Sequence, residues 1–257
     1  MKEFVIRTIS AIILAGIVIG GIIYLPVYII KLFIAVLSVL ATWEINNIFE
    51  KKFSNISNPF SLITSFLASL SILFVSFYLA LFLITLYSFW VGKKYYDINY
   101  LVFSFFGLIY TTFFISSVGI LIEIDKNLIF VLFAVVWFGD IFAYIIGKNF
   151  GKRKLSPVIS PKKTVEGAIG SFVASVIFGL IFAYYLKFDV LYLSIPIFLS
   201  AIFLQIGDLF ESFIKRQFEV KDSSNIIPGH GGILDRIDSL IFASVIFVIY
   251  SQIFKIL

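Results

Sequence analysis

The stretch GDLFESFIKRQFEVKDSSNIIPGHGGILDRIDS, residues Gly207–Ser239, lies between two long apolar runs. It holds six of the 15 acidic residues of the chain, four of the 20 basic residues and the one histidine. The two flanking runs have the composition of membrane-spanning helices; they are Leu191–Phe210 and the residues from Ile237 onward. Ionisable groups are costly within membrane spans, so polar residues set this densely between two spans predict a functional site.

The composition of the whole chain is that of a protein whose solvent is mainly lipid. Of its 257 residues, 61% are hydrophobic and only 14% are charged, whereas soluble domains have about 25% charged residues. The apolar runs are unbroken rather than alternating, which favours α-helices over a membrane barrel. We therefore predict an all-α, polytopic integral membrane protein.

The residue types that are missing narrow the function further. The sequence has no cysteine, which excludes disulfide frameworks and thiolate metal sites. Its net charge of +5 fits basic loops on the inner side of a membrane and anionic partners such as phosphates. No platform of interleaved aromatic and basic residues indicates nucleic-acid binding, so nucleic acid is not an expected partner.

The apolar runs predict about nine transmembrane helices. One run, Phe60–Val91, has 32 residues, and as a single helix it would be about 48 Å long, too long for a bilayer core of about 30 Å. It is also short for two full spans. We predict that it forms a hairpin of two short spans, because a single crossing would place Lys51 and Lys52 on the opposite face from Lys93 and Lys94. The other expected spans are at about Thr8–Tyr24, Ile29–Asn46, Asn99–Leu121, Leu128–Ile146, Ala168–Leu186, Leu191–Phe210 and from Ile237 to the C-terminus. The first of these is expected to be an uncleaved helix.

The distribution of lysine and arginine sets the expected orientation. With nine spans and the N-terminus inside, 16 of the 20 basic residues lie on the cytoplasmic side. We predict a multi-pass protein of the inner (plasma) membrane, with a cytoplasmic N-terminus and active site and the C-terminus outside. The chain is expected to form a single membrane domain, 1–257. Residues 1–125 would be spans for packing or dimer formation, and 126–257 would carry the catalytic spans and loops.

Acidic residues within or at the mouths of the spans are candidates for function, because each costs about 3 kcal/mol or more in a bilayer. They are Asp140, Asp208, Glu211, Asp235 and Asp238. Asp140 and Asp208 lie about 10–12 Å inside the cytoplasmic ends of their spans, and Asp235 and Asp238 begin the last span at the same face. Carboxylates from three helices are therefore expected to meet in one shallow, cytoplasm-facing polar cavity.

Helical spacing groups other side chains with these acids. One polar stripe is formed, at spacing i, i+3, i+4, i+7, by Asp208, Glu211, Ser212 and Lys215. A ridge of small residues that allows close helix approach is formed beside Asp140 by Gly139, Ala143 and Gly147. Ser160 is expected to cap a helix that Pro161 opens, which would begin the span at Ala168–Leu186.

Carboxylate ligands with no cysteine and a single histidine favour Mg²⁺ over zinc or copper. Mg²⁺ is usually held by one or two carboxylates together with phosphate oxygens, and basic loops and glycine-rich turns bind such phosphates. The residues expected to bind substrate are Lys162, Lys163, Thr164, Ser212, Arg216, Lys221, His230, Gly231, Gly232 and Arg236. The residues alone thus predict a magnesium-dependent site for a nucleotide or polyphosphate.

Three segments carry a resemblance to a known family. The string SFIKRQFEVKDSSNIIPGHGGILDRID, Ser212–Asp238, resembles the signature of CDP-diacylglycerol synthases, also called phosphatidate cytidylyltransferases. The segment GKRKLSPVISPKKTVEG, Gly151–Gly167, resembles a second characteristic stretch of that family. Asp140–Tyr144 is similar to its Asp-x-x-Ala-Tyr element, with Ile141 in place of a small hydroxyl residue.

The resemblance implies transfer of a cytidylyl group from CTP to phosphatidate, which gives CDP-diacylglycerol and pyrophosphate. It also implies that Asp208 and Asp235 hold Mg²⁺. Lys215 is a further expected catalytic residue, and Asp140, Glu211 and Asp238 are additional candidate ligands. A second cation such as K⁺ and a homodimer are further implications. Phosphatidate already carries an anionic phosphate nucleophile, so positioning and charge neutralisation are the expected means of catalysis.

Other interpretations remain open at this point. A CTP-dependent lipid-alcohol kinase would use similar helices and metal but would release CDP. A transporter of phosphorylated solutes would also place charges within spans, although usually near the midplane. Asp208 and Asp235 could instead form structural ion pairs with Lys215 or Arg236, and Asp140 could pair locally.

Overall fold

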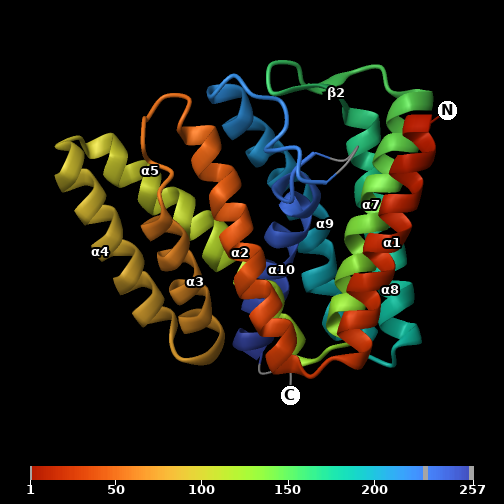
Figure 1. Ribbon diagram of the computed structural model, residues 1–257. Helices are drawn as coiled ribbons and strands as arrows, with labels where there is room; N and C mark the ends of the chain where they lie inside the picture. Colours follow the sequence, from red (N-terminus) through yellow and green to blue (C-terminus); the bar gives the residue numbers. More distant parts are fainter. Residues whose placement is uncertain (1, 228–230, 255–257) are drawn as a thin grey trace. The chain divides into compact units, whose positions relative to one another are not determined.

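The computed structural model describes residues 2–227 and 231–254, with side chains described from residue 13 onward. Within this part of the chain the structure is helical, apart from one small β-hairpin (Figure 1). The helices are α1 (Lys2–Tyr24), α2 (Val27–Phe49), α3 (Pro59–Phe74), α4 (Phe77–Tyr95), α5 (Ile98–Leu108), η1 (Ile109–Phe113), α6 (Phe114–Ile124), α7 (Leu128–Phe150), α8 (Val165–Tyr185), α9 (Val190–Gln217) and α10 (Leu234–Phe254).

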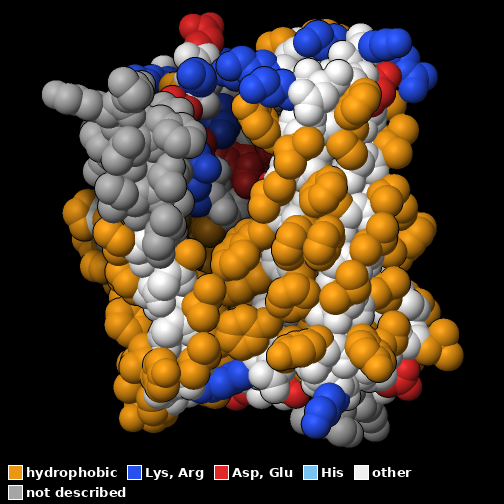
Figure 2. Space-filling model, turned by 90° about the vertical axis from the view of Figure 1, so that its right-hand side faces the viewer, with side chains coloured by type: hydrophobic (Ala, Val, Ile, Leu, Met, Phe, Trp, Pro, Cys, Tyr) orange, Lys and Arg blue, Asp and Glu red, His pale blue; other side chains and the backbone are white. Residues whose placement is uncertain are grey.

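The helices have the lengths and surfaces that a bilayer requires. Among the described residues, six are long and apolar enough to cross a membrane: α2, the continuous segment Ile98–Ile124, α7, α8, α9 and α10. Figure 2 shows hydrophobic side chains over the middle of one face and basic side chains gathered mainly along its upper edge. The predicted all-α, polytopic membrane architecture is therefore confirmed, and the number of nine spans stays a prediction.

The chain divides into two compact units, the first comprising Met1–Ile120 and Gln217–Arg236. In this unit the apolar stretch 60–91 is divided at Val75 and Ser76, where α3 ends and α4 begins as a hairpin (Figure 1). The Ser76 side chain accepts a hydrogen bond from the Tyr78 amide and so caps α4. The predicted break in this stretch is therefore present.

Small polar side chains join the helices of the first unit. The Thr42 hydroxyl on α2 lies 2.8 Å from that of Ser65 on α3 and 2.6 Å from that of Thr111 in η1. A second contact of this kind joins Ser69 and Ser116 at 2.9 Å. Interhelical hydrogen bonds between small residues are typical of membrane helices, because small side chains let the backbones approach closely.

The second unit comprises Leu121–Arg216 and Ile237–Leu257. Its helices α7 and α8 pack along the predicted ridge of small residues. A Cβ at Gly147 would lie 3.1 Å from the Thr164 hydroxyl, and one at Gly167 would lie 2.8 Å from the Ala143 carbonyl oxygen. The close approach of α7 to α8 is thus confirmed.

The basic segment between α7 and α8 differs from the prediction. Strands β1 (Lys154–Ser156) and β2 (Ser160–Thr164) pair in antiparallel fashion, and α8 begins only at Val165. The expectation that Ser160 caps a helix opened by Pro161 is wrong. The fixed φ of proline suits an extended strand as well as a first helical turn, and here the Thr164 hydroxyl accepts the Gly167 amide at 3.1 Å to cap the helix.

The polar stretch 207–239 consists of two helical ends and a connecting loop. Helix α9 continues through the polar residues to Gln217, and α10 begins at Leu234. The loop belongs to the first unit, whereas most of α9 and α10 belong to the second. The residues of this continuous stretch are therefore divided between two structural units.

Candidate functional site

Three helices of the second unit contribute carboxylates to one acidic cluster, which we define as Asp140 on α7, Asp208 on α9 and Asp238 on α10. Asp238 interacts electrostatically with both of the other members. The small residue Gly207 lets α9 and α10 approach here, since a Cβ at this position would lie 2.5 Å from the Asp238 carbonyl oxygen and 3.0 Å from Phe242 Cβ. The structure therefore brings together three of the predicted site residues.

Lysine side chains neutralise this cluster. The Lys163 ammonium, carried by β2, forms an ion pair with Asp208 Oδ2. Lys215 Nζ lies 3.0 Å from Glu211 Oε1, one turn away on α9, and both side chains are buried. Lys215 also interacts electrostatically with Asp238. The ion pair considered for Asp208 thus exists, but its partner is a lysine of the hairpin.

Side chains of the predicted polar stripe on α9 contact one another. The Ser212 hydroxyl donates to Asp208 Oδ1 at 3.5 Å, at the outer limit of a hydrogen bond. Arg216 Nε donates to the carbonyl oxygen of Ile159 at 3.3 Å, which ties the end of α9 to the β-hairpin. Lys162, the other expected phosphate-binding lysine, is exposed, whereas Thr164 is buried at the start of α8.

A separate set of contacts lies in the first unit, around the loop before α10. Asp235 Oδ2 accepts hydrogen bonds from the Ser223 amide at 2.8 Å, the Ser223 hydroxyl at 3.0 Å and the Gly232 amide at 2.8 Å. These donors fix the orientation of the Asp235 carboxylate at the first turn of its helix. Gly231 has a φ of +85°, a conformation that glycine adopts without strain.

Glu44, a fully buried acid on α2, was not among the residues expected to be functional. Its Oε1 accepts the Ser224 hydroxyl at 2.6 Å and the Ile233 amide at 2.8 Å. Its Oε2 accepts the Ser223 hydroxyl at 3.0 Å and the Leu234 amide at 2.8 Å. A signal was available, because an acid inside an expected span is a functional candidate by the rule that selected Asp140 and Asp208.

We call Glu44, Ser223, Ser224, Gly232 and Asp235 the loop clamp. Gly232 is required by close approach, since a Cβ there would collide with the Ser223 hydroxyl and lie 2.5 Å from Glu44 Oε1. Two residues expected to bind phosphate, Lys221 near the start of this loop and Arg236 in the first turn of α10, are both exposed. His230 lies outside the described residues.

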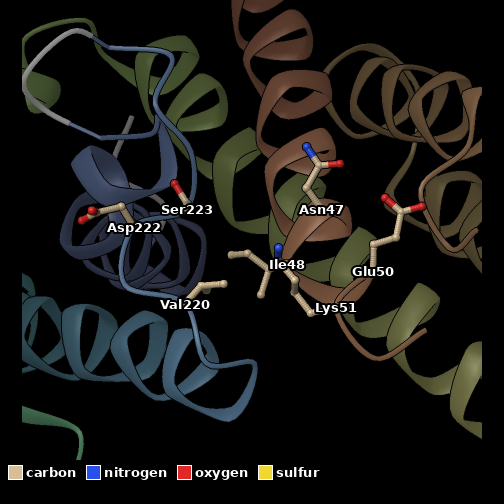
Figure 3. A pocket seen from close by; sticks show the side chains of 7 residues that line it. All are labelled: Asn47, Ile48, Glu50, Lys51, Val220, Asp222 and Ser223. Atoms are coloured by element: carbon tan, nitrogen blue, oxygen red, sulfur yellow. The ribbon is translucent and has the colours of Figure 1, made fainter. Parts of the chain in front are cut away.

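A pocket of about 420 Å³ opens beside the loop clamp, between the end of α2 and the start of the loop. It is lined by Asn47, Ile48, Glu50, Lys51, Val220, Asp222 and Ser223 (Figure 3). Because Ser223 belongs both to the pocket wall and to the loop clamp, the clamp also shapes one side of this pocket.

The expected magnesium ion can be tested against these donors. Within residues 2–227 and 231–254, no three acidic or histidine side chains are arranged to hold a metal ion by themselves. Mg²⁺ usually takes one or two carboxylates and completes its shell with water and phosphate oxygens. Asp208 and Asp238, which are hard oxygen donors in mutual electrostatic range, fit this smaller requirement. The expectation that Asp235 joins them in one cavity stays a prediction.

Comparison with known proteins gives consistent results. A family model described as the cytidylyltransferase family matches residues 5–254. A phosphatidate cytidylyltransferase of Staphylococcus saprophyticus is 52% identical over 123 residues, or 46% of this chain and 47% of that protein. The protein of the same name from Bacillus subtilis is 51% identical over 117 residues, or 44% of this chain and 43% of that protein. The match thus spans about half the length of these curated relatives.

Proposed function

Because the chain belongs to the cytidylyltransferase family, we propose that it transfers a cytidylyl group from CTP to phosphatidate. The resemblance carried by Gly151–Gly167 and Ser212–Asp238 is confirmed by the family match over residues 5–254. The names of the relatives support phosphatidate as the lipid substrate. In the proposed reaction a phosphate oxygen of phosphatidate bonds to the α-phosphorus of CTP, and the bond to the β-phosphate breaks to release pyrophosphate.

The observation that best supports this chemistry is the Lys163–Asp208 ion pair beside Asp238. A phosphoryl-type transfer between two anions needs positive charge at the phosphates and acidic groups that hold a cation, but it needs no protein nucleophile. Lys163 and the exposed Lys162, both on β2, supply the positive charge. Asp208 and Asp238, on apolar helices, supply the acidic groups that hold a cation.

We propose that Asp208 and Asp238 hold Mg²⁺, and that Asp235 serves as the further ligand implied by the family resemblance. When bound, such an ion neutralises charge on the phosphates and on the departing pyrophosphate. The residues of the chain orient the reactants: Lys163 and Arg216 hold the triphosphate, and Lys215 keeps positive charge beside Asp238. A second cation such as K⁺ and assembly as a homodimer stay predictions.

The membrane setting is part of the proposal. The six long apolar helices, together with α1, α3 and α4, would make nine spans, with the N-terminus and the reaction at the cytoplasmic face and the C-terminus outside. The diacyl chains of phosphatidate could then remain in lipid while CTP arrives from water. The lipid-alcohol kinase is not favoured, because the relatives are named as cytidylyltransferases.

The direct experiment uses purified protein in detergent with CTP, Mg²⁺ and phosphatidate. The expected products are CDP-lipid and pyrophosphate in equal amounts, whereas a kinase would release CDP and a transporter would consume no CTP. The variant Asp208→Asn should lower turnover at least 100-fold while the protein remains folded. Its matched control is Asp189→Asn, an exposed acid at the start of the same helix whose side chain accepts only local backbone amides.

Two results would contradict the proposal. A folded wild-type protein that forms no CDP-lipid would exclude the reaction. An Asp208→Asn variant with the same turnover as Asp189→Asn would exclude the role of the acidic cluster, even if the reaction itself were observed.

A further inference from the structure

The buried Glu44 carboxylate on α2 is bound by donors from a loop about 180 residues away in the sequence. Each oxygen lies within hydrogen-bonding distance of two donors from residues 223–234. The single hydrogen of one of these donors, the Ser223 hydroxyl, is shared with Asp235 Oδ2. Burying a carboxylate costs free energy unless such donors satisfy it. The arrangement requires glutamate at position 44, because a shorter or uncharged side chain cannot accept hydrogen bonds from the same four donors.

Two of the four donors are the backbone amides at the start of α10. The amides of Ile233 and Leu234 lie at the end of the helix where N–H groups have no intrahelical partners. A negative charge at this end also interacts favourably with the helix dipole. Glu44 thus serves as a cap supplied by a distant helix, and it fixes where α10 begins.

The other two donors are hydroxyl groups of the loop, and one of them leads to Asp235. The Ser223 hydroxyl lies 3.0 Å from Glu44 Oε2 and 3.0 Å from Asp235 Oδ2. The Ser223 amide donates to the same Asp235 oxygen. A displacement of Ser223 from Glu44 would therefore change the donors that orient the Asp235 carboxylate.

We propose that Glu44 is a positioning residue for the cytidylyl transfer, which acts through Ser223 and the start of α10 to hold Asp235 in its working orientation. This inference rests on the proposed function. Glu44 touches neither substrate nor metal in this proposal, so its loss should lower kcat more than it changes KM for CTP. The loop should also open more often when Glu44 is replaced.

The primary test is Glu44→Gln, with Glu123→Gln as the control because Glu123 is an exposed acid at the end of an apolar helix. Glutamine keeps the volume but replaces one acceptor oxygen by an NH₂ group, which cannot accept a backbone N–H. Hydrogen exchange measured by mass spectrometry should become at least tenfold faster in peptides that contain the Ile233 and Leu234 amides. Peptides from α7 and α8 should be unchanged, and kcat should fall at least tenfold.

A second variant keeps the test informative if Glu44→Gln does not fold. Ser224→Ala removes one donor to Glu44 and leaves Ser223 in place, so it should speed the same exchange by a smaller factor, about threefold. A double-mutant cycle adds a readout that general destabilisation would not give. If Glu44 acts through Ser223, the effects of Glu44→Gln and Ser223→Ala on kcat should be less than additive.

The outcomes separate this inference from the proposed function. Exchange and kcat in Glu44→Gln that equal those of Glu123→Gln would overturn the positioning role. Additive effects in the cycle would refute action through Ser223. If wild-type protein forms no CDP-lipid, the proposed function fails, and the exchange comparison still decides whether Glu44 holds the loop.

Discussion

The substitution Gly139→Ala tests how tightly α7 must pack on α8 to place the neighbouring Asp140. A Cβ at Gly139 would collide with the Ser175 hydroxyl and lie 3.2 Å from the Ser171 hydroxyl and 3.4 Å from Leu204 Cδ2. The Ser175 hydroxyl cannot simply turn away, because it is buried and donates to the Val135 carbonyl at 2.6 Å. The new methyl group must therefore break this hydrogen bond or separate the helices.

The expected cost follows from three contributions. Overpacking of a tight contact costs about 1–3 kcal/mol, and loss of the Ser175 hydrogen bond costs about 1 kcal/mol. Alanine in place of glycine within a helix returns about 1 kcal/mol. The net destabilisation is about 1–3 kcal/mol, which corresponds to a fall in Tm of about 2–12 °C for a chain of this size.

Thermal unfolding of the purified protein in detergent measures this difference. The matched control is Gly16→Ala on α1, where no atom lies within 4 Å of the added Cβ, so that Tm should stay the same or rise. Adding Ser175→Ala to Gly139→Ala should restore part of the lost Tm, because it removes the atom that the new methyl group meets. If Gly139→Ala were as stable as Gly16→Ala, the inferred packing of α7 on α8 would be refuted.

Two other substitutions test the charges of the acidic cluster. Lys163→Met should lower turnover at least tenfold. It should change the free energy of unfolding by less than about 1 kcal/mol, since its ion pair with Asp208 is partly exposed. Turnover equal to that of the wild-type protein would contradict the role of Lys163. Glu211→Gln should destabilise the protein by about 3 kcal/mol or more, because it removes the carboxylate 3.0 Å from the buried Lys215 ammonium; a fall in Tm of less than a few degrees would contradict this inference.

Much of the helical framework follows from the sequence for a simple physical reason. A bilayer leaves few alternatives to α-helices for long apolar runs, so the spans could be located from composition alone. The division of stretch 60–91 into two helices followed from its length and from the basic residues on either side of it, whereas the position of the break, at Val75 and Ser76, did not. The extension of α9 to Gln217 followed from helical spacing of its polar residues. In each case the deciding information is local.

The features that the sequence did not predict depend on distant partners. Pro161 was compatible with both a strand and a helix start, and pairing of β2 with β1 decided between them. The partner of Asp208 is Lys163, from a different element, rather than a neighbour on α9. Glu44 and its donor Ser224 are separated by 180 residues. No periodicity or local motif reports such a contact.

The placement of Glu44 changes how the N-terminal half of the chain is understood. That half resembles generic spans, and a role in packing or dimer formation was the natural expectation for it. Yet the loop that contains Ser223 and precedes Asp235 groups structurally with residues 1–120, and Glu44 is what satisfies its amides and hydroxyls. Phe218, at the start of this loop, packs against Phe49 and Phe103 of the same unit, and Glu44 satisfies the polar groups farther along the loop. An apolar helix that carries one buried acid does this well, because the acid finds no other partner in lipid as favourable as the loop donors. The N-terminal spans are thus inferred to contribute to the reaction through the conformation of this loop.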